Sequence, residues 1–203
     1  MPTDFSRQDM IAKLENTERD SYHHWDRLVE RLKHHTQRAD GTLVGVDLGG
    51  GTGYLARTFC NQPQFVRRMY SADVAEVLTE WAKSKAEERA EWRGRVVPVK
   101  CSPDEVVLPE KVDFAICVNV LHHLADVATY FRNLTRICNP GSVLLIVDYK
   151  PERLERNGEE FGPKMAWNVK MSSQRLTELI QGEWQPLEVL EFEYHYNAFF
   201  RLR

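Results

Sequence analysis

The chain has 203 residues, of which 42% are hydrophobic and 28% are charged, a composition typical of one water-soluble globular domain. A formal net charge of -3 and an isoelectric point near 6.2 argue against nucleic acid or an anionic membrane as a partner. The sequence has no apolar run near the roughly 20 residues of a membrane helix, and its opening "MPTDFSRQDM" lacks the layout of a signal peptide. We therefore expect an intracellular, cytoplasmic protein.

The cysteines predict buried reduced thiols rather than a metal site or disulfides. They are scattered along the chain without a C-x-x-C pair, whereas metal ligation and disulfides favour closer or paired spacing. Three of them lie in or beside apolar runs, and unpaired cysteine is among the most frequently buried residue types. The four are Cys60, Cys101, Cys117 and Cys138.

The N-terminal part of the chain predicts a helical extension. Residues 4–38 are highly charged, and their apolar side chains recur at helical spacing, which is typical of amphipathic helices lying against a larger body. The character of the sequence changes at Thr42, so we expect the extension over residues 1–40 and the main domain over residues 41–203. The apolar positions are Ile11, Leu14, Tyr22, Trp25, Leu28, Val29 and Leu32.

Apolar runs and helical stretches then alternate along the chain. The runs, typical of buried strands, are "TLVGVDL", "FVRRMYSAD", "RVVPVKC", "VDFAICVNV" and "SVLLIVDY". Stretches with helical period lie between them, such as "AEVLTEWAKSKAEERAEW" and "ADVATYFRNLTRIC". This alternation predicts an α/β fold with a largely parallel sheet that is covered by helices on both faces.

The C-terminal part follows a different pattern. After a helical stretch, apolar residues of "PLEVLEFEYHYNAFFRLR" alternate with polar ones, which predicts a closing antiparallel pair of strands with Asn197 near the turn. The polar, glycine-containing segment 150–167 is long enough to be a lid or a binding loop.

Four glycines lie within five residues in "VGVDLGGGTGYLA", directly after the first strand. A phosphate-binding P-loop needs Gly-Lys-Ser/Thr after its turn, and this loop has no lysine. A dinucleotide-binding turn needs G-x-G-x-x-G, but Tyr54 stands where its last glycine belongs. The remaining pattern is Asp47-x-Gly49-x-Gly51-x-Gly53.

This pattern resembles motif I of the class I S-adenosylmethionine-dependent methyltransferases. The resemblance implies a Rossmann-like, seven-stranded, mostly parallel sheet with an antiparallel C-terminal strand and helices on both faces. It also implies that S-adenosylmethionine is the cofactor and S-adenosylhomocysteine the product. Glycines let the backbone approach a ligand closely, so the residues expected around the methionine and ribose parts are Asp47, Gly49, Gly50, Gly51 and Gly53.

Three later motifs extend the resemblance over roughly residues 40–150. In "YSADVAE", Asp73 looks like the family's acid for the two ribose hydroxyls, because two adjacent hydroxyls can donate to one carboxylate, and Val74 follows it in the binding segment. In "CSPDEVVLP", Ser102 and Asp104 correspond to residues beside the adenine. In "DFAICVNVLHHL", Asn119 would flank the methionine part.

The tail and the N-terminal extension carry narrower likenesses. "VDYKPERLERNGEEFGPK" resembles the type 11 branch that includes the ubiquinone and menaquinone ring C-methyltransferases, although the quinone substrate is not carried over to this chain. N-terminal helices of the family often cover the cofactor, so the extension over residues 1–40 is expected to pack over the site of the methyltransferase domain, residues 41–203.

Candidate catalytic residues follow the fourth and fifth strands. Methyl transfer from a sulfonium mainly requires alignment, and a general base is needed only if the acceptor must lose a proton. His122, Asp148 and Tyr149 are the candidates, with Lys150 beside them; adjacent helical residues do not share a face, so only one of His122 and His123 can point into the site. The acceptor would be lined by Tyr22, Tyr149 and Trp167.

Several functions compete. The leading one is methyl transfer to a small-molecule acceptor. A protein or nucleic-acid methyltransferase is the alternative, disfavoured by the mild acidity and by the lack of an added recognition domain. A third possibility is a methyltransferase-like partner subunit without catalysis. A fourth is an aminopropyl transferase, although no polyamine-binding pattern is recognisable in the sequence. The sequence leaves open the acceptor, the methylated atom and the oligomeric state, for which a homodimer is one option.

Overall fold

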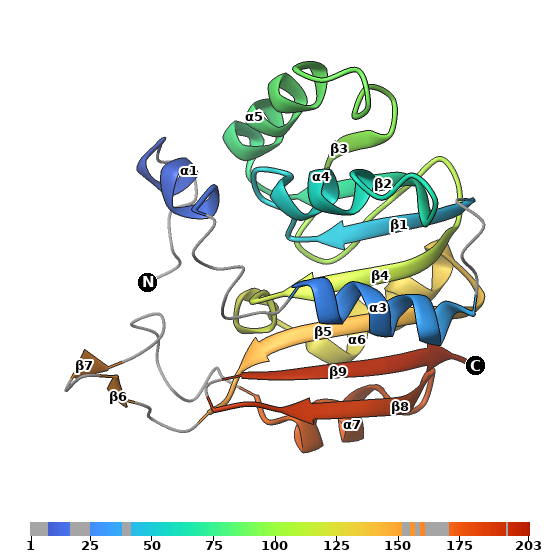
Figure 1. Cartoon of the computed structure of the whole chain (residues 1–203). Coiled ribbons are helices and arrows are strands. Elements are labelled where there is room, and N and C mark those ends of the chain that lie inside the picture. The colour runs from blue at the N-terminus through green and yellow to red at the C-terminus, as the bar shows by residue number, and fades with distance from the viewer. Residues whose placement is uncertain are drawn as a thin grey trace.

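Seven strands form one sheet in the order β3-β2-β1-β4-β5-β9-β8 (Figure 1). The computed structural model describes residues 8–16, 25–37, 42–151, 155–156, 159–160, 171–193 and 195–203. The strands are β1 Leu43–Leu48, β2 Val66–Asp73, β3 Val96–Lys100, β4 Val112–Val118, β5 Cys138–Tyr149, β8 Trp184–Glu191 and β9 His195–Leu202. A separate two-stranded pair consists of β6 Glu155–Arg156 and β7 Glu159–Glu160.

The first five strands are parallel, and β9 alone runs antiparallel, between β5 and β8. This confirms the predicted seven-stranded, mostly parallel sheet with an antiparallel C-terminal strand. The position expected for the turn was wrong: Asn197 lies inside β9 opposite Val147, and the chain reverses before His195. The alternation of apolar and polar residues continues through the turn, and the Phe192 N–H donates to the His195 carbonyl at 2.9 Å.

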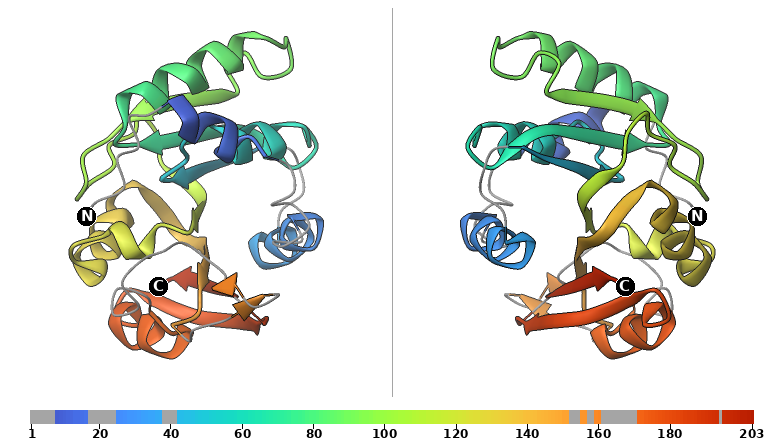
Figure 2. Two further views of the ribbon diagram at one scale, coloured as in Figure 1. Left: turned by 90° about the vertical axis from the view of Figure 1, so that its left-hand side faces the viewer. Right: turned by 90° about the vertical axis from the view of Figure 1, so that its right-hand side faces the viewer.

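Helices cover both faces of the sheet, as predicted. On one face lie α3 Trp25–Thr36, α4 Tyr54–Cys60 and α5 Glu76–Glu87; on the other lie α6 Val127–Leu134 and α7 Ser173–Ile180. Figure 2 shows α3 and α6 on opposite sides of the sheet. Two short 3-10 helices, η1 Leu121–His123 and η2 Thr135–Ile137, flank α6, and α1 is Gln8–Leu14. No helix in the described ranges is long and apolar enough to cross a membrane.

Local sequence explains where two of these helices begin. The Asp126 side chain caps α6 by accepting from Thr129 N–H at 3.0 Å, and the Ser172 hydroxyl caps α7 by accepting from Arg175 N–H at 3.2 Å. Such caps satisfy backbone donors that have no partner inside the helix. Pro98 lies in β3, where an edge strand tolerates the missing N–H.

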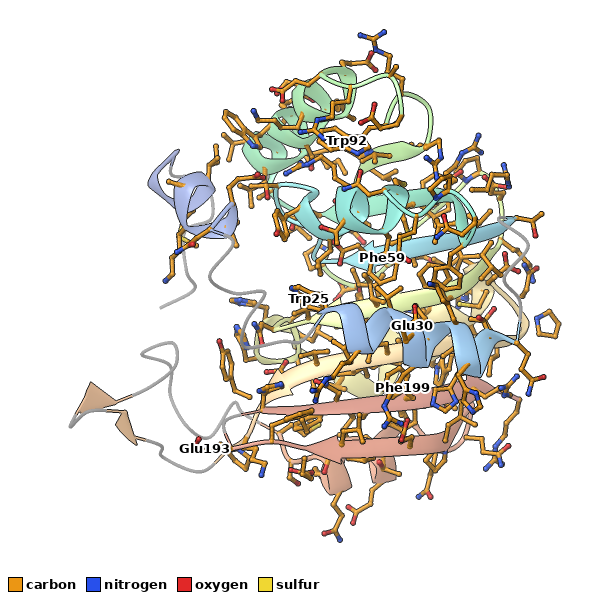
Figure 3. All side chains as sticks on the ribbon, in the orientation of Figure 1. Trp25, Glu30, Phe59, Trp92, Glu193 and Phe199 are labelled. Atoms are coloured by element: carbon orange, nitrogen blue, oxygen red, sulfur yellow. The ribbon has the colours of Figure 1, made fainter. Side chains whose placement is uncertain are left out.

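Helix α3 is part of the core. Leu28, Val29 and Leu32 are at most 2% exposed, and they pack in the same cluster as Phe199 of β9 (Figure 3). The other end of the helix is tied to the sheet, because Arg201 donates to the His35 carbonyl at 2.7 Å. This helix therefore stabilises the sheet directly, independently of the position of α1.

Three of the four thiols that were predicted to be buried are buried. Cys60, Cys117 and Cys138 are buried and Cys101 is partly buried, and none of them forms a disulfide. Burial raises the pKa of the Cys60 thiol to about 11 and that of Cys138 to about 12. These thiols therefore stay protonated and unreactive near neutral pH.

Gly45 makes room for the aromatic side chains at the centre of the sheet. It lies on β1 between Met69 of β2 and Phe114 of β4, and a Cβ atom here would overlap both side chains. Phe114 in turn packs against Phe59 and Phe65, with ring centroids 5.8 and 5.9 Å apart. A side chain at Gly45 would disturb this whole cluster.

We expect Gly45→Ala to lower the free energy of unfolding by about 1–3 kcal/mol, because overpacking a filled core forces side chains out of their preferred rotamers. Urea unfolding would measure the change. Gly182→Ala is the control, since nothing lies within 4 Å of its added Cβ, and it should change stability by less than about 0.5 kcal/mol. Equal effects of the two variants would contradict this account of Gly45.

Candidate functional site

The turn between β1 and α4 consists of glycines except for Thr52, whose side chain is buried. Gly49, Gly51 and Gly53 have φ angles of +69°, +55° and +75°, a region that side-chain-bearing residues rarely adopt. The N–H groups of Gly49 and Gly50 donate to the Ala72 carbonyl at 2.8 and 3.0 Å, which ties the turn to the end of β2. The glycines themselves therefore place no side chain on the surface of the turn.

Two polar side chains lie beneath this turn. Asp47 is 2% exposed and stands opposite Ser71 in the pairing of β1 with β2. A Cβ at Gly50 would overlap the Ser71 hydroxyl and lie 3.1 Å from Oδ2 of Asp47. The glycine at position 50 thus lets the turn close down on the acid that ends β1.

Asp73 ends β2 and faces the same turn. Its Oδ2 accepts from Gly51 N–H and its Oδ1 from Ala75 N–H, both at 2.8 Å. Burial raises the pKa of this carboxyl above its ordinary value, and the backbone N–H donors oppose that rise. Each oxygen keeps a lone pair for a further donor. The next residue, Val74, is 48% exposed and offers an apolar surface beside the acid.

Asn119 lies where β4 ends. It adopts a φ of +55°, and its N–H donates to the Val147 carbonyl at 2.8 Å. Its Oδ1 is buried and has no hydrogen-bond partner among the described residues. A Cβ at Gly49 would lie 2.5 Å from Cγ2 of Val120, so the glycine turn and the segment after β4 are in contact. The end of β4 therefore brings an unused acceptor next to the turn.

Ser102 and Asp104 lie in a local turn after β3. The Ser102 hydroxyl donates to the Glu105 carbonyl and accepts from Glu105 N–H, each at 3.0 Å. Asp104 is exposed, and its carbonyl accepts from Asn133 at 3.3 Å. The segment starts beside the acid of β2, since Cys101 N–H donates to the Asp73 carbonyl at 3.0 Å.

A buried histidine–carboxylate pair lies at the ends of β4 and β5. Nδ1 of His122 is 3.8 Å from Oδ1 of Asp148, and the two side chains are 5% and 4% exposed. Asp148 is itself fixed, because its Oδ2 accepts from Leu121 N–H at 3.0 Å and its Oδ1 from Tyr149 N–H at 2.7 Å. The structure therefore brings together the side chains of two predicted catalytic residues, His122 and Asp148, whereas the third, Tyr149, contacts Asp148 through its backbone N–H.

His123 differs from its neighbour. The two imidazole rings are 4.0 Å apart, and His123 is the more exposed of the two residues. Burial of its ring and the charge of His122 lower the pKa of His123 to about 4. A base with such a pKa is weak near neutral pH.

Other predicted residues are placed elsewhere or lie outside the described ranges. Tyr22 and Trp167, expected to line the acceptor, belong to the undescribed segments. Lys150 is engaged in an ion pair with Glu191 at 3.0 Å. Sequence reasoning missed Arg57, which is buried in α4 directly after the glycine turn. Its signal was a charged residue in an otherwise apolar helix, "YLARTFC".

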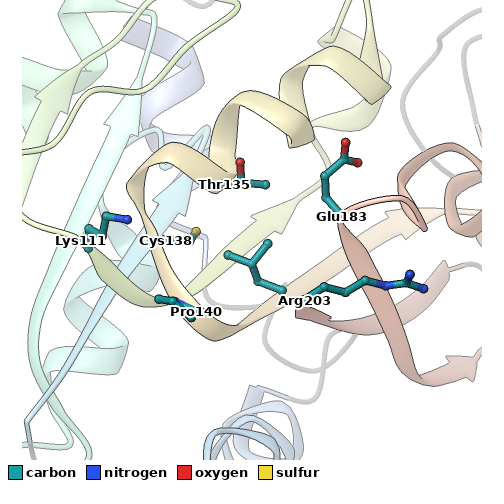
Figure 4. A pocket seen from close by; sticks show the side chains of 7 residues that line it. Lys111, Thr135, Cys138, Pro140, Glu183 and Arg203 are labelled. Atoms are coloured by element: carbon teal, nitrogen blue, oxygen red, sulfur yellow. The ribbon is translucent and has the colours of Figure 1, made fainter.

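A hollow of about 310 Å³ lies at the opposite end of the strands (Figure 4). It is formed where β5 begins and β9 ends, away from the glycine turn. Because ligands of open parallel sheets bind beyond the carboxyl ends of the strands, this hollow is not the candidate site. Its lining residues are Lys111, Thr135, Cys138, Pro140, Glu183, Leu202 and Arg203.

Comparison with known proteins identifies the family. The sequence model of a family described as a methyltransferase domain matches residues 17–185, most of the chain. The chain belongs to this methyltransferase family. At the level of the family, this confirms the predicted enzyme class and the predicted cofactor, S-adenosylmethionine.

Individual relatives are more distant. A polyketide synthase component, the lovastatin nonaketide synthase of Aspergillus terreus, is 26% identical over 161 residues, which cover 77% of this chain and 5% of that protein. An S-adenosylmethionine-dependent methyltransferase from Aquifex aeolicus superposes with a TM-score of 0.79 at 20% identity, covering 96% of this chain and 98% of that one. The [4+2]-cyclase SpnF superposes with a TM-score of 0.69 at 15% identity, covering 87% and 80%. At these identities the two superpositions establish the fold.

The lowered pKa of His123 predicts a pH dependence of stability. A histidine whose pKa is lower in the folded state than in the unfolded state stabilises the fold above its ordinary pKa of 6.5. That contribution is lost as the pH falls towards about 4. We expect His123→Gln to reduce the fall in melting temperature between pH 7 and pH 5, with the exposed His34→Gln as a control. Parallel melting curves for His123→Gln and the wild type would contradict the prediction.

Proposed function

We propose that this methyltransferase acts on a small molecule whose reacting atom must lose a proton, with His122 as the general base. The observation that carries the proposal is the buried pair of His122 and Asp148 at the ends of β4 and β5. Burying a titratable pair is unfavourable unless the groups are matched, so such pairs are concentrated at functional sites. The predicted cytoplasmic location and homodimer, and the extension over residues 1–40, stay predictions.

The groups around the glycine turn fit S-adenosylmethionine. The carboxylate of Asp73 keeps lone pairs for two ribose hydroxyls, and the exposed Val74 offers an apolar contact for a base. The buried Oδ1 of Asn119 needs a donor, which the ammonium of the methionine part would supply. A Cβ at Gly49 or Gly50 would meet neighbouring side chains, so the packing of the turn requires glycine at both positions. Glycines also let a ligand approach the backbone closely. Ser102 and Asp104 are the proposed residues near the adenine.

When bound, the cofactor supplies a methyl group on a positively charged sulfur. The residues of this chain position the acceptor and take up its proton. Asp148 faces Nδ1 of His122, which favours the tautomer with the proton on Nδ1 and leaves Nε2 as the base. Tyr149, fixed through its N–H by Asp148, lies next to this pair on β5.

The small-molecule acceptor is supported by two observations. The mild net negative charge offers no general attraction for nucleic acid. The relative from Aspergillus terreus is a polyketide synthase component, although this chain matches only 5% of its length. A carbon between two carbonyl groups and a phenolic oxygen both carry protons that a neutral histidine can remove, so a 2,4-diketone and a catechol are suitable first acceptors.

We expect Asp73→Ala to weaken S-adenosylmethionine binding at least about tenfold in calorimetric titration, because hydrogen bonds to a charged group contribute roughly 1.5–3 kcal/mol. Asp73→Asn keeps one oxygen that can accept from the Gly51 N–H of the turn. A comparable loss of affinity in that variant would therefore assign the effect to the charge of Asp73. The affinity of the wild type should decrease as the pH is lowered through the pKa of Asp73, which lies above the ordinary 3.8. Only the ionised carboxylate accepts hydrogen bonds from both hydroxyls. Unchanged binding in both variants would remove Asp73 from the site.

For methyl transfer, His122→Gln should lower kcat by about 100- to 10,000-fold while leaving the affinity for S-adenosylmethionine unchanged. The assay follows transfer of labelled methyl to each probe acceptor. His123→Gln is the matched control and should retain activity. Full activity of His122→Gln would refute the proposed base, and cofactor binding without transfer to any acceptor in the wild type would favour a partner subunit.

A further inference from the structure

Arg57 is a buried cation directly beneath the glycine turn. It is 6% exposed, and Nη1 donates to the Thr52 carbonyl at 2.7 Å, inside the turn itself. The guanidinium also lies over the Trp92 ring at 5.6 Å. A buried charge is costly unless a counter-charge and hydrogen bonds accompany it. The conformation of this turn therefore depends on how Arg57 is neutralised.

The counter-charge comes from the N-terminal part of the chain. Both carboxylate oxygens of Glu15 lie 2.7 Å from Nη2 of Arg57. Glu15 follows α1 directly and is 26% exposed on its side chain. In the described ranges no other carboxylate forms an ion pair with Arg57. The end of α1 is thus fixed to the helix that leaves the glycine turn.

This ion pair brings an apolar side chain onto the outer surface of the turn. Cδ1 of Leu14 lies 3.4 Å from the position that a Cβ of Gly51 would occupy, which is van der Waals contact. Figure 1 shows α1 beyond the ends of β1 and β2, where the strands lead into the turn. Gly51 is also the residue whose N–H is held by Asp73. Leu14 and Asp73 therefore meet the same residue.

We infer that Glu15 and Arg57 are positioning residues that hold α1 against the glycine turn and thereby slow the release of the cofactor. The inference rests on the proposed cofactor site. When Glu15 loses its charge, Arg57 is left without its counter-ion, so the free energy that docks α1 decreases. Because coupling between two binding equilibria is reciprocal, the factor by which a docked α1 raises the affinity for the cofactor equals the factor by which bound cofactor favours the docked α1.

The test uses S-adenosylhomocysteine and the variant Glu15→Gln, which keeps the shape of the side chain but removes its charge. Stopped-flow fluorescence should show dissociation about tenfold faster than in the wild type, a coupling of ordinary size. In hydrogen exchange, the ligand should protect the amides of residues 10–15 in the wild type and protect them less in the variant. Glu80→Gln is the matched control, because Glu80 pairs with Lys83 on the exposed face of α5.

A second variant, Leu14→Ala, removes the apolar contact without changing charge and should also speed dissociation. Unchanged dissociation in both variants, with normal binding by the wild type, would overturn the inference and leave the methyltransferase proposal standing. Tighter binding by Glu15→Gln would overturn it as well, because Glu15 would then compete with the cofactor's own carboxylate for Arg57. Absence of binding by the wild type would overturn both proposals together.

Discussion

The structure of the site depends on the glycine turn between β1 and α4, in which only Thr52 carries a side chain. Its three left-handed glycines let the backbone fold over Asp47 and place N–H groups within reach of Ala72. The turn is also held to the end of the neighbouring strand β2, because the Gly51 N–H donates to the carboxylate of Asp73. Any added Cβ would meet one of these neighbours or require a strained φ.

The part of the candidate site around the glycine turn and the part at the ends of β4 and β5 differ in the chemical groups that they present. The part proposed to hold the cofactor consists mainly of backbone, one carboxylate and an amide oxygen. The part where transfer would occur contains a buried pair, His122 and Asp148. The fold is shared with a [4+2]-cyclase, so the fold alone does not define the reaction. The side chains that follow β4 and β5 are where two proteins of this fold can differ in chemistry.

Much of the architecture could be predicted from sequence because buried parallel strands appear as apolar runs and glycine clusters mark tight turns. The turn of the last hairpin could not, since alternation continues past it and Asn197 gave no signal of its place inside β9. The pairing of Arg57 with Glu15 joins residues 42 positions apart, and it arises only when α1 and α4 come together in the fold. Ser102 shows the opposite case, where a local turn uses a hydroxyl expected to face a ligand.

The place of β9 has a consequence for how the chain acquires this sheet. It is the last strand in sequence order, yet it lies inside the sheet, between β5 and β8. The buried strand β5 therefore has an unpaired edge on the growing nascent chain until β9 has left the ribosome, and such edges are templates for aggregation. Because β8 and β9 are joined by a short connection, they can form a local hairpin and dock as one unit, which shortens the time for which that edge stays open.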